Sequence, residues 1–129
     1  MEDQILFVDD EVSLLSAIER LLGFDYNLRL AESGAAGLEM IREHGPFTII
    51  FTDMRMPGMD GLEFIKQARE MTPKSIFVML SGNNDEKTEL DAIDQGRVFR
   101  FLQKPCDEAQ LVEAIEACKQ QYDLGTQSS

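Results

Sequence analysis

Five polar side chains suited to phosphate or metal chemistry each follow directly on a short apolar run of the sequence. They are Asp9, Asp10, Asp53, Ser81 and Lys104. The preceding runs have the length and composition of buried parallel strands. Because the functional crevice of an open parallel sheet lies beyond the carboxyl ends of its strands, we expect these side chains to converge there.

The three aspartates among them indicate a metal site. Carboxylates gathered in one crevice repel one another, and a bound cation relieves that repulsion. Magnesium prefers oxygen ligands, keeps several waters and is commonly held by one or two carboxylates together with a phosphate oxygen. The sequence therefore predicts a Mg²⁺ or Mn²⁺ site in which Asp10 and Asp53 supply carboxylates and Asp9 binds through a water. The backbone carbonyl of Arg55 is close enough in sequence to be a further ligand.

The same residues can support transfer of a phosphoryl group onto a carboxylate, because the charge on the transferring oxygens can be neutralised from several sides. The metal covers one side. Lys104, whose direction is restricted by Pro105, can bind a second oxygen. The Ser81 hydroxyl and the backbone amides of Gly82 and Asn83 can donate hydrogen bonds to a third oxygen. The pattern predicts a phosphoryl-transfer site that needs no general base beyond the acceptor.

The elements that must position these residues follow from the apolar pattern. Short apolar runs alternate five times with segments of helical period, which is typical of a parallel sheet with crossover helices. The expected strands cover residues 5–8, 27–31, 47–52, 75–80 and 98–103. Helices are expected over residues 11–22 and 83–95, and after the capping residues Ser33, Asp60 and Asp107. The helix at 83–95 has few apolar residues, so we expect it to be the least firmly held element.

Length and charge limit the possible functions. A chain of 129 residues fits one compact domain, which we place at 1–124, followed by a polar tail over 125–129 that we expect to be flexible. There are 24 acidic and 12 basic side chains, and a net charge of −12 disfavours direct binding to nucleic acids or anionic membranes. No apolar run approaches the roughly 20 residues that span a bilayer. We therefore expect a cytoplasmic protein.

Motifs at the ends of the expected strands resemble those of the receiver domains of two-component response regulators, the CheY-like family. They are Val8-Asp9-Asp10-Glu11, the stretch from Asp53 to Gly61, Leu80-Ser81-Gly82 and Lys104-Pro105. The resemblance extends from about residue 4 to residue 122. It implies an α/β, flavodoxin-like (βα)5 fold: a doubly wound five-stranded parallel sheet in the order 2-1-3-4-5, with helices on both faces.

The resemblance also implies a role for each residue of the site. Asp53 is the phosphoacceptor and receives its phosphoryl group from a sensor histidine kinase or a phosphotransfer protein. Asp9 and Asp10 are the metal pair, and Lys104 is the partner of the phosphate. Together with Ser81, these residues let such a domain catalyse its own phosphorylation and a slow dephosphorylation, without acting as a classical enzyme.

A conformational switch is a further implication of the resemblance. The Ser81 hydroxyl follows the phosphoryl group, and Phe101, three residues before Lys104, changes rotamer. Because Phe101 has no hydroxyl, this switch relies on burial of the ring alone. The surface formed by the helix at 83–95, the strand at 98–103 and the last helix then changes. It controls an output domain or a partner protein, and it can support a homodimer on phosphorylation.

Two other function classes fit parts of the pattern. An aspartate-nucleophile phosphatase also uses an Asp at a strand end, but Glu11 stands where such enzymes usually repeat the Asp, and we find no cap domain. The second class is a degenerate receiver that only binds proteins, and the intact acidic set argues against it. Sustained turnover of a small phosphoester would favour the phosphatase, whereas failure to bind Mg²⁺ would favour the binding module.

Overall fold

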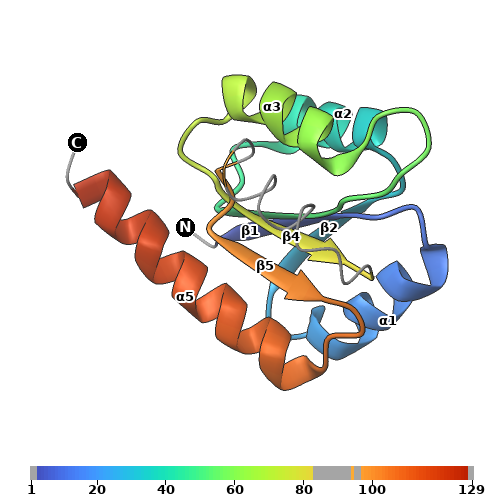
Figure 1. Cartoon of the computed structure of the whole chain (residues 1–129). Coiled ribbons are helices and arrows are strands. Elements are labelled where there is room, and N and C mark those ends of the chain that lie inside the picture. The colour runs from blue at the N-terminus through green and yellow to red at the C-terminus, as the bar shows by residue number, and fades with distance from the viewer. Residues whose placement is uncertain (1–2, 83–93, 95–96, 128–129) are drawn as a thin grey trace.

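The computed structural model describes residues 3–82, 94 and 97–127, and it contains one five-stranded parallel sheet (Figure 1). The strands are β1 (Gln4–Val8), β2 (Asn27–Ala31), β3 (Ile49–Asp53), β4 (Ile76–Ser81) and β5 (Arg100–Gln103). All four strand pairings are parallel, and the order across the sheet is β2-β1-β3-β4-β5. The predicted doubly wound sheet is therefore confirmed.

Four helices in the described ranges cover the two faces of this sheet. They are α1 (Val12–Leu22), α2 (Gly34–His44), α3 (Gly61–Met71) and α5 (Glu108–Gln127). α2 and α3 lie on one face, and α1 and α5 lie on the other (Figure 1). The predicted helix at 83–95 lies outside the described residues. No helix in the described ranges is both long and apolar enough to cross a membrane.

The sheet separates two apolar cores. Side chains alternate between the faces of a strand, so Leu6 and Ile50 join the core beneath α2 and α3, whereas Phe7 and Phe51 join the core beneath α1 and α5. The rings of Phe7 and Phe51 stack with centroids 4.3 Å apart. Every residue of β3 is buried, as a central parallel strand covered on both faces requires. This central strand ends at Asp53, so the site is built on the most deeply buried element of the sheet.

The helix caps form as the sequence predicts. The Ser33 side chain caps α2 by accepting a backbone hydrogen bond. Asp60 and Glu63 form a reciprocal capping box at the start of α3. Asp107 and Gln110 make the same reciprocal pair before α5, at 2.8 and 2.9 Å. These caps fix where the helices begin relative to the strand ends that carry the site.

Some element ends differ from the predictions by one or two residues. β3 begins at Ile49 and β5 begins at Arg100, each two residues later than predicted. The reason is that Phe47 and Val98, which precede these strands, are buried without pairing in the ladder, and apolar composition marks burial rather than strand pairing. α5 continues through Gln127, so residues 125–127 are helical where the sequence indicated a tail. The flexibility of that tail stays a prediction.

Gly37 lets α2 pack closely against its neighbours. A Cβ atom at Gly37 would lie 2.7 Å from Phe64 Cε1 of α3 and 2.9 Å from Val8 Cγ2 of β1. Both distances are shorter than ordinary carbon contacts, and both neighbours are fully buried. The helix can therefore occupy this position only with a small residue at its inner face.

We expect Gly37→Ala to lower the free energy of unfolding by about 1–3 kcal/mol, because the added methyl group overpacks a core that has no free space. Gly125→Ala is the matched control, since a Cβ there meets no atom within 4 Å in the part of the chain that the structure describes. Its stability should be unchanged or up to about 1 kcal/mol higher, through helix propensity. Urea denaturation measures both. Equal stability of the two variants would contradict the close packing of α2.

Candidate functional site

The strand ends at one edge of the sheet surround a hollow of about 380 Å³. Its lining residues are Asp10, Glu11, Asp53, Arg55, Ser81, Gly82 and Lys104. Asp9 lies beside them, only 2% exposed. Asn83, the remaining predicted phosphate-binding residue, lies outside the described residues. Side chains from four separate parts of the chain thus meet in one place.

The turn after β1 places its two aspartates differently. The Asp9 amide donates to the Ala31 carbonyl at 3.0 Å, and the Glu11 amide donates to Asp9 Oδ1 at 2.9 Å. These bonds hold the Asp9 carboxylate in a buried position, while Asp10 is exposed. Asp9 is therefore the most deeply buried carboxylate of the cluster. The residue pattern predicts that it binds the metal through a water, and the family resemblance makes it one of the metal pair.

Asp53 is fixed by a loop that packs against its own backbone. It is the last residue of β3 and is 6% exposed. The Gly61 amide donates to the Met54 carbonyl at 2.8 Å, and a Cβ at Gly61 would lie 2.3 Å from the Asp53 carbonyl oxygen. Only glycine lets α3 begin this close to the end of β3. The capping box at the start of α3 therefore helps to fix the position of the Asp53 backbone.

The three aspartates meet the geometric requirements of a cation site. One oxygen from each of Asp9, Asp10 and Asp53 lies within 4.8 Å of the others. The Asp9 carboxylate is buried, and Lys104 Nζ lies 2.7 Å from its Oδ2 in an ion pair. An all-oxygen donor set with unused lone pairs suits a hard divalent ion such as Mg²⁺ or Mn²⁺. The predicted ligand Arg55 also lines the hollow.

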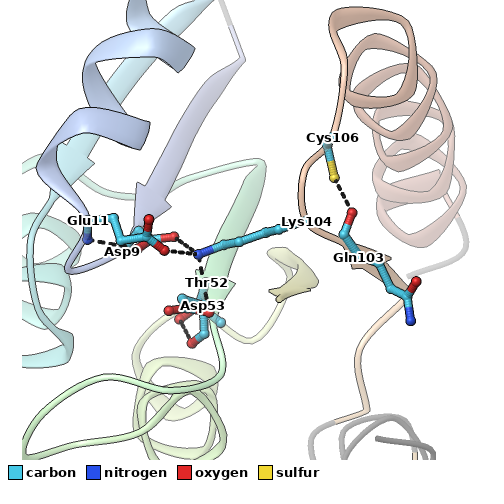
Figure 2. A network of polar contacts seen from close by, with 7 residues as sticks. All are labelled: Asp9, Glu11, Thr52, Asp53, Gln103, Lys104 and Cys106. Atoms are coloured by element: carbon cyan, nitrogen blue, oxygen red, sulfur yellow. Dashed lines mark hydrogen bonds and ion pairs between the residues drawn. The ribbon is translucent and has the colours of Figure 1, made fainter. Parts of the chain in front are cut away.

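Lys104 projects its ammonium group among three carboxylates (Figure 2). Its Nζ lies 2.7 Å from Asp9 Oδ2, 3.1 Å from Glu11 Oε1 and 3.5 Å from Asp53 Oδ1. The Lys104 amide donates to the Ser81 carbonyl at 2.8 Å, which holds the end of β5 beside the end of β4. The ammonium group is thus the internal counter-ion of the acidic cluster.

The electrostatics of the site follow from this crowding. Burial and the nearby Asp9 carboxylate raise the pKa of Asp53 above its usual value of 3.8, although Lys104 acts in the opposite direction. Burial alone would lower the pKa of Lys104, but its hydrogen bonds to Asp9 and Glu11 and the charge of Asp53 outweigh burial, so the pKa is raised. Lys104 therefore stays charged at neutral pH, and the cluster still has an excess of negative charge.

The two residues of the expected switch lie on neighbouring strands. Ser81 is the last residue of β4, is 1% exposed and lines the hollow. Phe101 lies in β5, paired with Met79, and its half-buried ring packs against the core beneath α2 and α3. The ring thus has both a buried and an exposed side, which a rotamer change would require.

Glu11 lines the hollow, although the residue pattern predicts no role for it in the site. Its side chain is 59% exposed, yet Oε1 accepts a hydrogen bond from Lys104 Nζ, 93 residues away. The only sequence signal for it is the third consecutive acidic residue after the first strand. The contact depends on how far Lys104 reaches across the edge of the sheet, which spacing along the chain does not reveal.

Comparison with known proteins identifies the family to which the chain belongs. The response regulator receiver domain model matches residues 5–116. A crystal structure of an adenylate cyclase from Rhodopirellula baltica superposes with a TM-score of 0.92 and 45% identity, over 99% of this chain and 95% of that chain. A response regulator receiver domain protein from Clostridium thermocellum has a TM-score of 0.87 and 28% identity, over 95% and 98% of the two chains.

The curated relatives are longer proteins. The transcriptional regulatory protein ZraR of Escherichia coli K12 is 33% identical over 113 residues, which cover 87% of this chain but 25% of ZraR. The chain thus spans about a quarter of the length of this relative.

Asp53→Asn is expected to raise the melting temperature of the metal-free protein at pH 7, by roughly 2–8 °C for each kcal/mol gained. A carboxyl group whose pKa is raised by folding contributes stability that is present below its unfolded value, near 3.8, and is lost as the pH rises through its pKa in the folded protein. Removing the charge recovers that loss. The gain should therefore shrink as the pH falls toward 4.

Asp25→Asn, the same change in an exposed loop outside the cluster, is the control and should shift the melting temperature little. Added Mg²⁺ should stabilise wild type more than Asp53→Asn, because the variant lacks one ligand charge. A lower melting temperature for metal-free Asp53→Asn would mean that the attraction of Lys104 for Asp53 exceeds burial and the repulsion from Asp9.

Proposed function

The chain belongs to the response regulator receiver family, and on that premise we propose that it is a phosphorylation-dependent signalling switch whose phosphoacceptor is Asp53. The donor is a sensor histidine kinase or a histidine phosphotransfer protein. The observation that carries this proposal is the buried Asp53 carboxylate at the end of β3, with Lys104 Nζ 3.5 Å away and two more aspartates within reach of one cation. We place this activity in the cytoplasm.

Asp9, Asp10 and Asp53 would hold a Mg²⁺ or Mn²⁺ ion, with the Arg55 carbonyl as a further ligand. When bound, this ion neutralises charge on the transferring phosphoryl oxygens and on the acceptor. The chain's own part begins with Asp53, which forms a bond to phosphorus while the bond from phosphorus to the donor's leaving group breaks. Because the acceptor is already a carboxylate, no proton has to be removed from it.

The remaining charge on the phosphoryl oxygens is balanced by residues that line the same hollow. Lys104 supplies an ammonium group, the Ser81 hydroxyl donates a hydrogen bond, and the Gly82 amide donates from the backbone. The sequence predicts the Asn83 amide as a further donor, although Asn83 lies outside the described residues. These contacts favour the domain's own phosphorylation. The hollow is open to solvent, so water can reach the aspartyl phosphate and hydrolyse it slowly.

The output of the switch is a change of surface at β5, α5 and the segment 83–95. Ser81 moves toward the phosphoryl group, and Phe101 turns inward behind it. A shift of this equilibrium from 1:99 to 99:1 needs about 5.5 kcal/mol of differential interaction, which several charge-assisted contacts together can supply. The changed surface acts on an output domain, on a partner protein or on a second copy of the domain. The greater length of ZraR supports an attached output domain.

Incubation with Mg²⁺ and a small acyl-phosphate donor, followed by intact mass measurement, tests the central claim. We expect one added phosphoryl group on wild type, none on Asp53→Asn and one on Asp60→Asn. Asp60 is the matched control because Asn also caps helices well and the residue lies seven positions beyond the acceptor. A phosphoryl group on Asp53→Asn would move the acceptor elsewhere. Sustained phosphoester turnover would instead favour a phosphatase.

Amide exchange before and after phosphorylation tests the proposed output surface. Exchange should change in residues 98–103 and 83–95 and stay constant in α2. That helix contacts β2 and β1, at the opposite end of the sheet from β5. Asp53→Asn treated in the same way reports any direct effect of the donor compound. Unchanged exchange in both segments, with phosphorylation verified by mass, would contradict this route to the output.

A further inference from the structure

Glu11 differs from the other partners of Lys104 in one respect. Asp9 and Asp53 belong, together with Asp10, to the acidic triad that suits a cation, whereas Glu11 lies outside that triad. Its backbone amide nevertheless donates to Asp9 Oδ1 at 2.9 Å, so the Glu11 backbone is held against the triad. The Glu11 backbone is therefore fixed at the rim of the hollow, and its carboxylate is not one of the expected metal ligands.

A divalent ion in the triad and the Lys104 ammonium would compete for the same oxygens. Lys104 Nζ lies 2.7 Å from Asp9 Oδ2 and 3.5 Å from Asp53 Oδ1. Two cations that share these carboxylates repel each other, and the repulsion is strong where burial lowers the effective dielectric constant. The ammonium group must therefore loosen its contact with Asp9 when the ion enters.

The alternative position for the ammonium group is already present in the structure. Glu11 Oε1 lies 3.1 Å from Lys104 Nζ, closer than the Asp53 oxygen does. Loss of the Asp9 contact therefore leaves Lys104 paired, at the open side of the hollow, where a phosphoryl oxygen would arrive.

We propose that Glu11 is a positioning residue that holds the Lys104 ammonium group at the rim of the hollow while the acidic triad takes up its divalent ion. Glu11 thereby strengthens binding of the ion without ligating it. This inference rests on the proposed function, because it assigns a regulatory contact within the same site. An exposed ion pair alone usually contributes little to stability. Here, however, the Lys104 side chain is only 13% exposed, and its other two partners, Asp9 and Asp53, are buried.

The test is a double-mutant cycle with Mg²⁺ affinity as the readout. The amide shifts of Asp10 and Gly82 during a Mg²⁺ titration measure that affinity in unphosphorylated protein. Glu11→Gln should weaken Mg²⁺ binding about two- to fivefold, the range of a partly exposed ion pair. Glu32→Gln is the matched control, since it removes the same charge from an exposed residue that follows β2 at the same edge of the sheet.

Lys104→Met supplies the second arm, because methionine keeps the apolar stem of the lysine. In the Lys104→Met background, Glu11→Gln should have no larger effect than Glu32→Gln, since the residue it positions is gone. An equal loss of affinity from Glu11→Gln in both backgrounds would overturn the proposal, because Glu11 would then act on the ion directly or through its charge alone. Lys104→Gln replaces Lys104→Met if the latter does not fold.

Phosphorylation kinetics give a second readout. For Glu11→Gln, the Mg²⁺ concentration that gives the half-maximal rate should rise by the same two- to fivefold. A fall only in the maximal rate would contradict a role in ion uptake. If wild type itself neither binds Mg²⁺ nor accepts a phosphoryl group, the proposed function fails. If wild type does both and the cycle shows no coupling, only the role of Glu11 fails.

Discussion

The repulsion among Asp9, Asp10 and Asp53 is the interaction that the rest of the site depends on. A parallel sheet delivers the ends of β1 and β3 to the same edge, and the turn after β1 buries Asp9 beside Asp53. Buried carboxylates at this spacing are unfavourable without compensation. Lys104 provides part of that compensation in the described structure, and a divalent ion would provide the rest. The site therefore carries an excess of negative charge, and a bound cation would reduce the repulsion that this charge causes.

The position of Lys104 connects this demand to the rest of the sheet. Its amide is bonded to the Ser81 carbonyl, so the residues that end β4 and β5 are tied together through their backbones. Phe101 lies three residues before Lys104, in β5, and packs against the core beneath α2 and α3. The switch that we propose would therefore need only this backbone hydrogen bond and three residues of chain to connect the site with Phe101.

The fold could be predicted from sequence largely because apolar runs and helix caps are local signals. The Asp60 and Glu63 capping box and the buried run that ends at Asp53 are readable from neighbours along the chain. Strand starts were less predictable, since Val98 is buried without pairing. The convergence of the aspartates, Ser81 and Lys104 at one edge of the sheet could be predicted from the topology. The contact between Glu11 and Lys104 could not. That contact depends on side-chain reach between distant segments, for which the sequence carries no local signal.

The glycines around the hollow have an implication for protein engineering. A Cβ atom at Gly61 would lie 2.3 Å from the Asp53 carbonyl oxygen, so any side chain at this position would displace the backbone of Asp53. Gly82 also lines the hollow, yet a Cβ at that position meets no atom of the described residues within 4 Å. A designer who wants to narrow the solvent entrance of the hollow can therefore substitute Gly82 but not Gly61.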